Sequence, residues 1–380
     1  MCDVVGQVHA LTTRGPGAEG HAPREPAASR GPVPVGGAER HRTRLVLLGT
    51  AGGPVWYGHR KGIASAVVVD DDVYLVDCGE GVGQQYRRAG FAPFEGRQTL
   101  RGLRGIFLTH LHSDHCVDYF NLWLFGWFNG MAFNPRVVHA YGPGNRGSLP
   151  PLFGPEPAPP VESPDNPAPG TVEMTRHLLQ AFAADINDRM RDDRRSALET
   201  LFQAHDIPLS PAIVAGANAE PAPDMDPVEV YEDENVAVRA ILVQHPPTFP
   251  SFAYRFDTAD GSIVFSGDTT VSPNLIRLAA GADVLVHEVI DAAWAESRFE
   301  PALDAVEQAA VHHLLSSHTT IEQVGAVAER AGVAMLVLNH LVPADNPHER
   351  WLEAQEGFSG RLVVGEDLMQ IGLGQRRGAG

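Results

Sequence analysis

The chain has 380 residues, and 29 Lys and Arg stand against 47 Asp and Glu, which gives a net charge of −18. No apolar run approaches the roughly 20 residues that span a bilayer, so we expect no membrane segment. An extended nucleic-acid surface needs clustered basic residues to displace counterions, and the acidic balance argues against nucleic acid as a partner. The three cysteines form no spaced framework, and the N-terminus has no signal-peptide pattern, so we expect a cytoplasmic location.

The first part of the chain divides into a tail and a strand-rich segment. Residues 1–42 are rich in Gly, Pro, Ala and Arg without a hydrophobic period, which predicts a disordered tail. The first part of the main domain is expected over 43–150, with one short helix before residue 90. Apolar runs that end at turn-forming residues predict its strands, at 44–49, 64–69, 73–76, 105–109 and 137–141.

The middle of the chain has a different composition. Prolines crowd residues 150–170, where no regular element is expected. An apolar residue recurs every fourth position from Leu178 to Met190, which predicts an amphipathic helix, and residues 196–205 are expected to form a second short helix. Residues 151–227 are therefore expected to be an inserted helical hairpin on flexible arms, which serves as a lid, a dimer contact or both.

The main domain is expected to resume over residues 228–380, where strands and helices alternate. A helix is predicted at 320–331. Apolar runs predict strands at 236–243, 252–256, 263–265, 284–286, 334–338 and within 361–373.

The strongest chemical signal is Thr109-His-Leu-His-Ser-Asp-His115, directly after a predicted buried strand. Imidazole nitrogens and carboxylate oxygens are ligands that zinc binds readily. In a sharp turn from strand to helix, His110 and His112 can face one pocket while Asp114 and His115 face its neighbour. The cluster therefore predicts two metal ions, and the alternative is a solvated loop that happens to be rich in histidine.

A cluster this short cannot complete two metal sites, so further ligands are expected at the ends of other strands. Ligand-type side chains follow four later apolar runs, at His245, Asp268, His287 and His340. Any one of them alone would be interpreted as a packing or surface residue. Four at strand ends indicate a shared site.

Together with the histidine cluster, six further motifs resemble the metallo-β-lactamase superfamily, in the branch of ribonuclease Z and the arylsulfatase-like metallohydrolases. These motifs are Leu48-Gly-Thr50, Asp77-Cys-Gly-Glu-Gly81, Phe265-Ser-Gly-Asp-Thr269, Val286-His-Glu288, His318-Thr-Thr320 and Asn339-His340. The resemblance implies an α/β fold, the αββα sandwich of two sheets with helices outside. It also implies a metal site along one edge of that sandwich.

The resemblance assigns roles to the ligand-type residues. It implies one metal ion on His110, His112 and His245 and a second on Asp114, His115 and His340, with Asp268 bridging the two. The ions would be Zn²⁺, with Mn²⁺ or Fe²⁺ as alternatives, and a water or hydroxide between them would be the nucleophile. Asp114 would also orient that nucleophile.

Four residues near the ligands receive supporting roles from the resemblance. His287, beside Glu288, would act as a general acid toward the leaving group. His318 would support the site from behind the ligands, or else be an ordinary residue at a helix N-terminus. Asp77 would likewise support a ligand, or be a turn residue before Gly79.

Three departures from ribonuclease Z guide the substrate prediction. His340-Leu-Val-Pro343 lacks the Ser- and Arg-containing segment of tRNA-processing enzymes, and Asp118 replaces their usual glycine. The insert carries six acidic against five basic residues from Thr171 to His205, a weak basis for holding RNA. We therefore expect hydrolysis of a small-molecule ester, a phosphodiester, sulfate or carboxylic ester. The alternatives are a tRNA 3′-processing endoribonuclease of the ribonuclease Z type and a non-catalytic metal-binding scaffold.

Two remaining segments are ambiguous. The apolar run Tyr119–Phe128 either lines a pocket beside the metals or forms a buried helix. His312 and His313 match no motif of the family and are expected to be surface or packing residues.

Overall fold

The computed structural model describes residues 34–35, 38–91, 96–152, 158–298 and 305–376. All of them belong to one compact unit formed by Gly31–Gly380. Most of the expected disordered tail lies outside the described residues. Its last part is ordered, because a strand begins at His41 and a two-residue strand at Pro34–Val35 pairs with the C-terminal strand.

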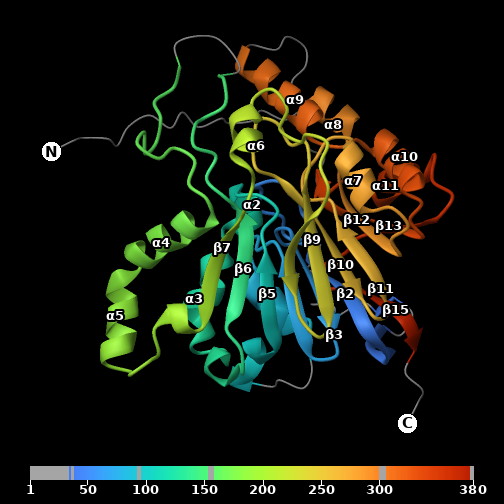
Figure 1. Ribbon diagram of the computed structural model, residues 1–380. Coiled ribbons are helices and arrows are strands. Elements are labelled where there is room, and N and C mark those ends of the chain that lie inside the picture. The colour runs from blue at the N-terminus through green and yellow to red at the C-terminus, as the bar shows by residue number, and fades with distance from the viewer. Residues whose placement is uncertain (1–33, 36–37, 92–95, 153–157, 299–304, 377–380) are drawn as a thin grey trace, which may run out of the picture. The chain divides into compact units, whose positions relative to one another are not determined.

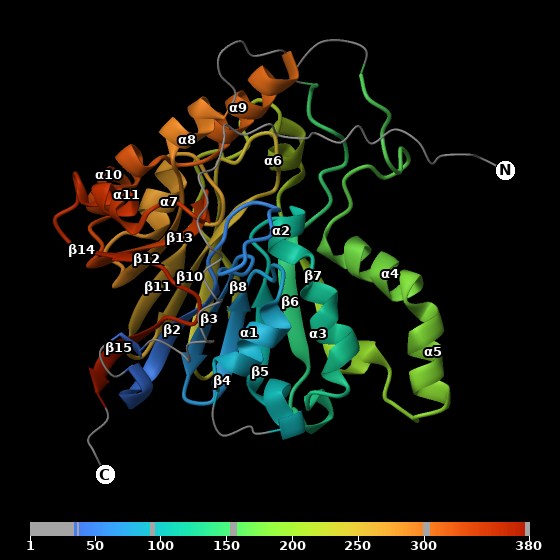
Figure 2. The same ribbon diagram turned by 180° about the vertical axis from the view of Figure 1, so that it is seen from behind.

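Two sheets form the centre of the fold, and Figures 1 and 2 show them face to face. In the first sheet the strand order is β1-β15-β2-β3-β4-β5-β6-β7. Its strands are β1 (Pro34–Val35), β2 (His41–Gly49), β3 (Ala64–Val69), β4 (Asp72–Val76), β5 (Leu103–Phe107), β6 (Val138–Pro143), β7 (Phe202–Ile207) and β15 (Gln370–Arg376).

In the second sheet the order is β14-β13-β12-β11-β10-β9-β8. Its strands are β8 (Val228–Glu232), β9 (Val236–Leu242), β10 (Phe252–Thr258), β11 (Gly261–Phe265), β12 (Val284–Ile290), β13 (Met335–Val342) and β14 (Arg361–Val364). Strands β11 to β14 run parallel, so their carboxyl ends lie at one edge of the sheet.

Helices cover the outer faces of both sheets, which completes the αββα sandwich that the resemblance implied. The helices of the first half are α1 (Val82–Arg88), α2 (Ser113–Cys116), α3 (Tyr119–Gly126), α4 (Thr171–Ala181), α5 (Ala183–Arg191) and α6 (Pro211–Gly216). Those of the second half are α7 (Pro273–Leu278), α8 (Ala292–Ser297), α9 (Ala305–Ser317), α10 (Ile321–Ala331) and α11 (His348–Leu352).

Three apolar clusters hold the layers together. One lies between α1, α3 and the first sheet and includes Tyr86 and Trp123. A second fills the space between the sheets around Phe107 and Phe256, and a third packs α7 and α10, with Val324, on the second sheet. Strands β3 and β12 are buried along their whole length, and their sequences are accordingly rich in apolar residues.

The apolar run after the histidine cluster forms a buried helix, α3. Tyr119, Phe120, Leu122 and Trp123 pack in the core below the first sheet. The alternative, that this run lines a pocket beside the metals, is therefore wrong for these four side chains. No helix in the described part of the chain has the length and apolar character to cross a membrane.

The predicted inserted hairpin is corrected by the structure. Its first helix is present but bends at Phe182, which ends α4 and precedes α5. Its second helix is absent, because Phe202–Ile207 forms β7 and pairs in parallel with β6. Phe202 and Ile207 are buried at the two ends of that strand, so tertiary pairing outweighs the local helical pattern. The segment 151–227 therefore returns to the first sheet and is not wholly an insertion.

Candidate active site

The ligand-type residues meet where the two sheets present their strand ends along one edge. After β5 the chain runs through Thr109 into α2, which places His110 and His112 before the helix and Asp114 and His115 within it. From the second sheet come three more, directly after or within strands: His245 after β9, Asp268 after β11 and His340 in β13. Strand-end loops of both sheets therefore converge on one place.

Among the described residues, four overlapping groups of ligand atoms lie there; two of them, which share no residue, are called the two clusters, and the other two bring in His318 and Glu288. The atoms within each cluster lie within 4.8 Å of one another; one comprises His110, His112 and His245, and the other comprises Asp114, His115, Asp268 and His340. These are the two sets that the sequence predicts for two metal ions.

Asp268 lies between the two clusters. Its Oδ2 atom is 3.3 Å from Nε2 of both His115 and His340, on the side of the second cluster. The same oxygen is 3.9 Å from His110 Nε2 and 4.0 Å from His245 Nε2, on the side of the first. Burial alone would raise the pKa of this carboxyl, but the surrounding imidazoles hold it well below its usual range. A carboxylate in this position can bridge two cations.

The chemistry of these donors fits a dinuclear metal site. His110 Nε2, His115 Nε2 and Asp268 Oδ1 are buried and have no hydrogen-bond partner. Buried polar atoms are normally paired, and several unpaired ones pointing into one space indicate a missing ligand. Metal ions bound there would satisfy these atoms, and imidazole with carboxylate is a donor set typical of zinc.

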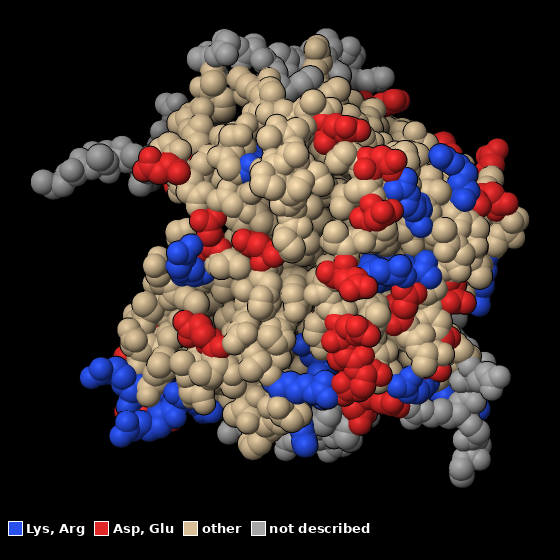
Figure 3. All heavy atoms as spheres, in the orientation of Figure 1, with Lys and Arg blue, Asp and Glu red and all other residues tan. Residues whose placement is uncertain are grey.

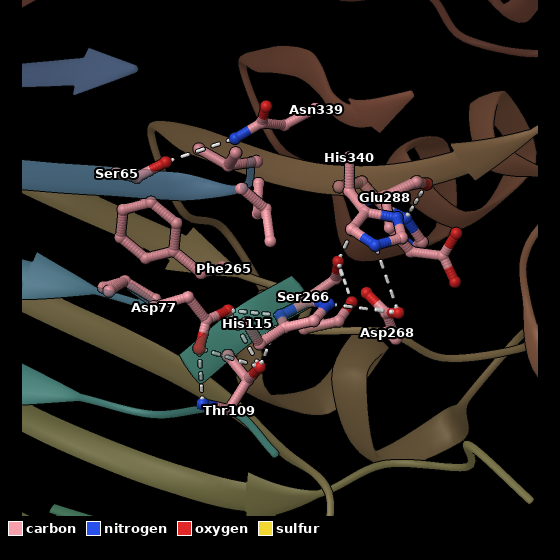
Figure 4. A pocket seen from close by; sticks show the side chains of 15 residues that line it. Ser65, Asp77, Thr109, His115, Phe265, Ser266, Asp268, Glu288, Asn339 and His340 are labelled. Atoms are coloured by element: carbon pink, nitrogen blue, oxygen red, sulfur yellow. Dashed lines mark hydrogen bonds and ion pairs between the residues drawn. The ribbon is translucent and has the colours of Figure 1, made fainter. Parts of the chain in front are cut away.

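Other side chains orient the ligands from behind, as Figure 4 shows for His115. His115 Nδ1 lies 2.8 Å from Asp77 Oδ2, and Asp77 in turn accepts hydrogen bonds from the backbone N–H and hydroxyl of Thr109. Asp77 is therefore placed where the family resemblance implies. Fixing the second ring nitrogen in this way determines which nitrogen is left for a metal.

Two ligands of the first cluster are held by contacts that sequence reasoning missed. Nδ1 of His245 lies 2.9 Å from the carbonyl oxygen of Ser317, and Nε2 of His112 lies 2.9 Å from the Thr248 hydroxyl. Neither partner belongs to a recognisable motif, and a main-chain carbonyl leaves no mark in a sequence.

Glu288 and His318 form a buried pair beside the metal ligands. His318 Nδ1 lies 3.0 Å from Glu288 Oε1, which also accepts the backbone N–H of Thr269. The His318 ring stacks on His340, with 5.9 Å between ring centroids. Burial would lower the pKa of His318, but Glu288 raises it to about 9. Of the two roles considered for His318, the structure therefore places it in the site, just before the helix α10.

His287 joins none of these groups of ligand atoms, although it lines the same small pocket as Asp268, Glu288 and His340, and its role as a general acid stays a prediction. Its Nδ1 atom lies 2.7 Å from the carbonyl oxygen of Glu288, and its buried Nε2 has no hydrogen-bond partner. The two residues are adjacent on β12, where successive side chains point to opposite faces. Glu288 reaches His318, and His287 belongs to none of the clusters of ligand atoms.

His313 was expected to be a surface or packing residue, and the structure adds that it lies beside proposed metal ligands. It lies on α9, half-buried, with its ring centroid 6.1 Å from that of His245, 6.2 Å from His318 and 6.4 Å from His112. His312, the next residue on the helix, is exposed.

Comparison with known proteins identifies the family of the chain. The family model of the metallo-beta-lactamase superfamily matches residues 59–312, two thirds of the chain. The chain belongs to the metallo-beta-lactamase superfamily. It is 30% identical over 337 residues to ribonuclease Z of Mycobacterium bovis, an alignment that covers 88% of this chain and 99% of the relative.

Solved structures agree on the fold. Human tRNase Z, short form, superposes with a TM-score of 0.55 at 17% identity over 87% of this chain and 99% of that one. The metallo-beta-lactamase fold protein YhfI of Bacillus subtilis gives 0.52 at 17% identity over 87% and 98%.

The match to the superfamily and the similarity to ribonuclease Z identify the chain as a metal-dependent hydrolase that acts on phosphodiester or other ester bonds. A non-catalytic scaffold is set aside. Two divalent ions are typical of the superfamily. The expected arylsulfatase-like character receives no support from these relatives, nor does a small ester in particular.

The expectation of a small-molecule partner, with nucleic acid unlikely, is wrong, because the relatives are ribonucleases by name. The net charge misled because it sums the whole chain and says nothing of how the charged side chains are distributed over the surface. Figure 3 shows arginines gathered at the lower left, over the end of α5, apart from the acidic side chains on the right. Asp118, which differs from the glycine usual in ribonuclease Z, has a structural role here. Its Oδ2 atom accepts the backbone N–H of Gly81 and fixes the loop before α1.

Proposed function

We propose that this protein is an endoribonuclease of the ribonuclease Z type, which hydrolyses a phosphodiester bond of precursor tRNA with two bound zinc ions. The observation that carries the proposal is the alignment with ribonuclease Z over nearly the full length of both chains, at 30% identity. The two clusters of ligand atoms support it, because they offer the donors of a dinuclear site.

The ligand roles in this proposal follow the geometry. His110, His112 and His245 would hold one ion, Asp114, His115 and His340 the other, and Asp268 both. Bound zinc would supply Lewis acidity and lower the pKa of a water from 15.7 to about 7. Asp114 Oδ2 accepts the backbone N–H of Gly53 at 3.1 Å, so its carboxylate is fixed in one orientation and can align a water for attack.

We assign the proton donor of the reaction to His318. Glu288 holds the His318 ring through Nδ1 and favours its protonated form, and the ring lies against two of the proposed ligands, His245 and His340. A protonated imidazole there can give its proton to the departing oxygen of the ester, and Glu288 then stabilises the ring orientation for the next cycle.

The test is cleavage of a precursor tRNA that carries a 3′ extension, by protein loaded with zinc, with bis(4-nitrophenyl) phosphate as a small reference substrate. We expect one discrete cut near the 3′ end of the mature tRNA. The variant Asp268→Ala should cut neither substrate. Hydrolysis of the small diester without any cleavage of the precursor would overturn the proposal.

A further inference from the structure

A cavity of about 520 Å³ lies beside the metal ligands, between the end of α6 and the helix α9. We propose that it is a subsite for the nucleobase of a nucleotide next to the scissile phosphodiester, with His313 at its polar wall. This inference rests on the proposed function, because it names part of the substrate that the same site would bind.

The position of the cavity supports this role. His313 lines it, and the ring of His313 lies close to His112, His245 and His318, so the cavity begins where the metal ligands end. Figures 1 and 2 both show α6 and α9 at the same end of the sandwich as the strand ends that carry the ligands. A group bound in the cavity would therefore be attached close to the phosphate at the metals.

The lining suits a flat ring with polar edges. Prolines and alanines form most of the wall, among them Pro151, Pro221 and Ala309, and they offer apolar surface against which a base can lie. His313 and Ser316 add polar groups. Nδ1 of the His313 ring lies 3.3 Å from the Ser317 hydroxyl, and within the described part of the chain this leaves Nε2 for the edge of a base.

The charge of the lining favours a phosphodiester. No carboxylate lines the described cavity, although the chain as a whole carries an excess of acids. Among the described lining residues the formal charge is that of Arg146, which is 8% exposed and donates a hydrogen bond to the carbonyl of Pro247. An anionic substrate therefore meets a cation in this described part of the lining.

A second cavity, of about 410 Å³, lies on the other side of Arg146 and serves as an internal comparison. Its polar side chains besides Arg146 are His112 and Thr248, and these two are hydrogen-bonded to each other. It therefore offers apolar surface without a polar group left for the edge of a base. For this reason we assign the base to the cavity beside α9.

The experiment compares two diesters, bis(4-nitrophenyl) phosphate and the 4-nitrophenyl ester of thymidine 5′-monophosphate, with zinc-loaded full-length protein. The variant Ala309→Trp fills the cavity beside α9, and Ala168→Trp fills the second cavity as a matched control. We expect Ala309→Trp to reduce kcat/KM for the thymidylyl ester at least tenfold more than for the base-free diester, through KM. We expect Ala168→Trp to leave the ratio of the two substrates unchanged.

A second variant guards against a folding defect. His313→Ala removes the polar wall without adding volume, and it should raise KM for the thymidylyl ester about fivefold or more while the melting temperature and zinc content match the wild type. Loss of selectivity in Ala168→Trp but not in Ala309→Trp, or a wild type that does not prefer the thymidylyl ester, would overturn the subsite. A preference for that ester without precursor cleavage would instead overturn only the proposed ribonuclease.

Discussion

The edge that carries the metal ligands and the segment between β6 and β8 differ in how their structure arises. At the edge, the proposed ligands lie just after strands β5, β9 and β11 or within β13, so local sequence already places them near strand ends. Between β6 and β8, a bent helix stands beside a strand, β7, that exists only because it pairs with β6. Positions set by short-range pattern are thus predictable, and those set by pairing across the fold are not.

The largest effect is expected at the residue that joins the two clusters. Asp268→Ala should lower turnover of any ester by about 10³-fold or more, because both proposed ions lose a shared ligand. Elemental analysis should find two metal ions in the wild type and fewer in the variant. Fewer than about one ion in the wild type, purified without chelator, would contradict a dinuclear site, and circular dichroism would check that the variant is folded.

The next largest effect distinguishes His318 from His287 as the proton donor of the reaction. His318→Ala should lower kcat by about 10²-fold or more, whereas His287→Ala should change it by less than about threefold, because His318 contacts the Glu288 carboxylate and His287 contacts the main-chain carbonyl of Glu288. Steady-state rates on bis(4-nitrophenyl) phosphate with equal zinc content provide the measurement. The reverse order would restore the role that the sequence suggests for His287.

A smaller effect is expected from a substitution of Asp77, which holds the ring of the proposed ligand His115. Asp77→Asn keeps the size of the side chain but weakens its hold on His115 Nδ1, so zinc affinity should fall by about 10- to 100-fold. Competition with a zinc-binding dye would measure the affinity. Rates at saturating zinc should recover most of the wild-type value, and an unchanged affinity would leave Asp77 as a turn residue.

The smallest effect tests whether the bent helix contributes to RNA binding. Changing its exposed arginines Arg176, Arg191 and Arg194 to Glu should raise KM for precursor tRNA about tenfold and flatten its dependence on salt. Hydrolysis of the small diester should stay as it is, since these residues lie away from the ligands.

The matched control reverses three exposed arginines elsewhere, Arg87, Arg330 and Arg361, and so changes the net charge equally. It should affect precursor cleavage much less. Equal effects of the two sets would mean that total charge, rather than the helix, governs RNA affinity. Deleting residues 151–227 would not be a clean test, because the deletion would also remove β7.

The sequence by itself determined most of the strands and the candidate ligands near their ends, His287 among them, because apolar runs and the residues that end them are local patterns. The motifs that resemble the metallo-β-lactamase superfamily added the layered fold. Only the tertiary structure showed that, of the two neighbours on β12, Glu288 and not His287 joins a group of ligand atoms. All seven residues of β12 are buried, so no alternation of polar and apolar residues marks its two faces, and His287 and Glu288 look equivalent. Likewise the formation of strand β7 and the position of His313 beside His245 depend on contacts between residues more than 60 positions apart, which no local pattern encodes.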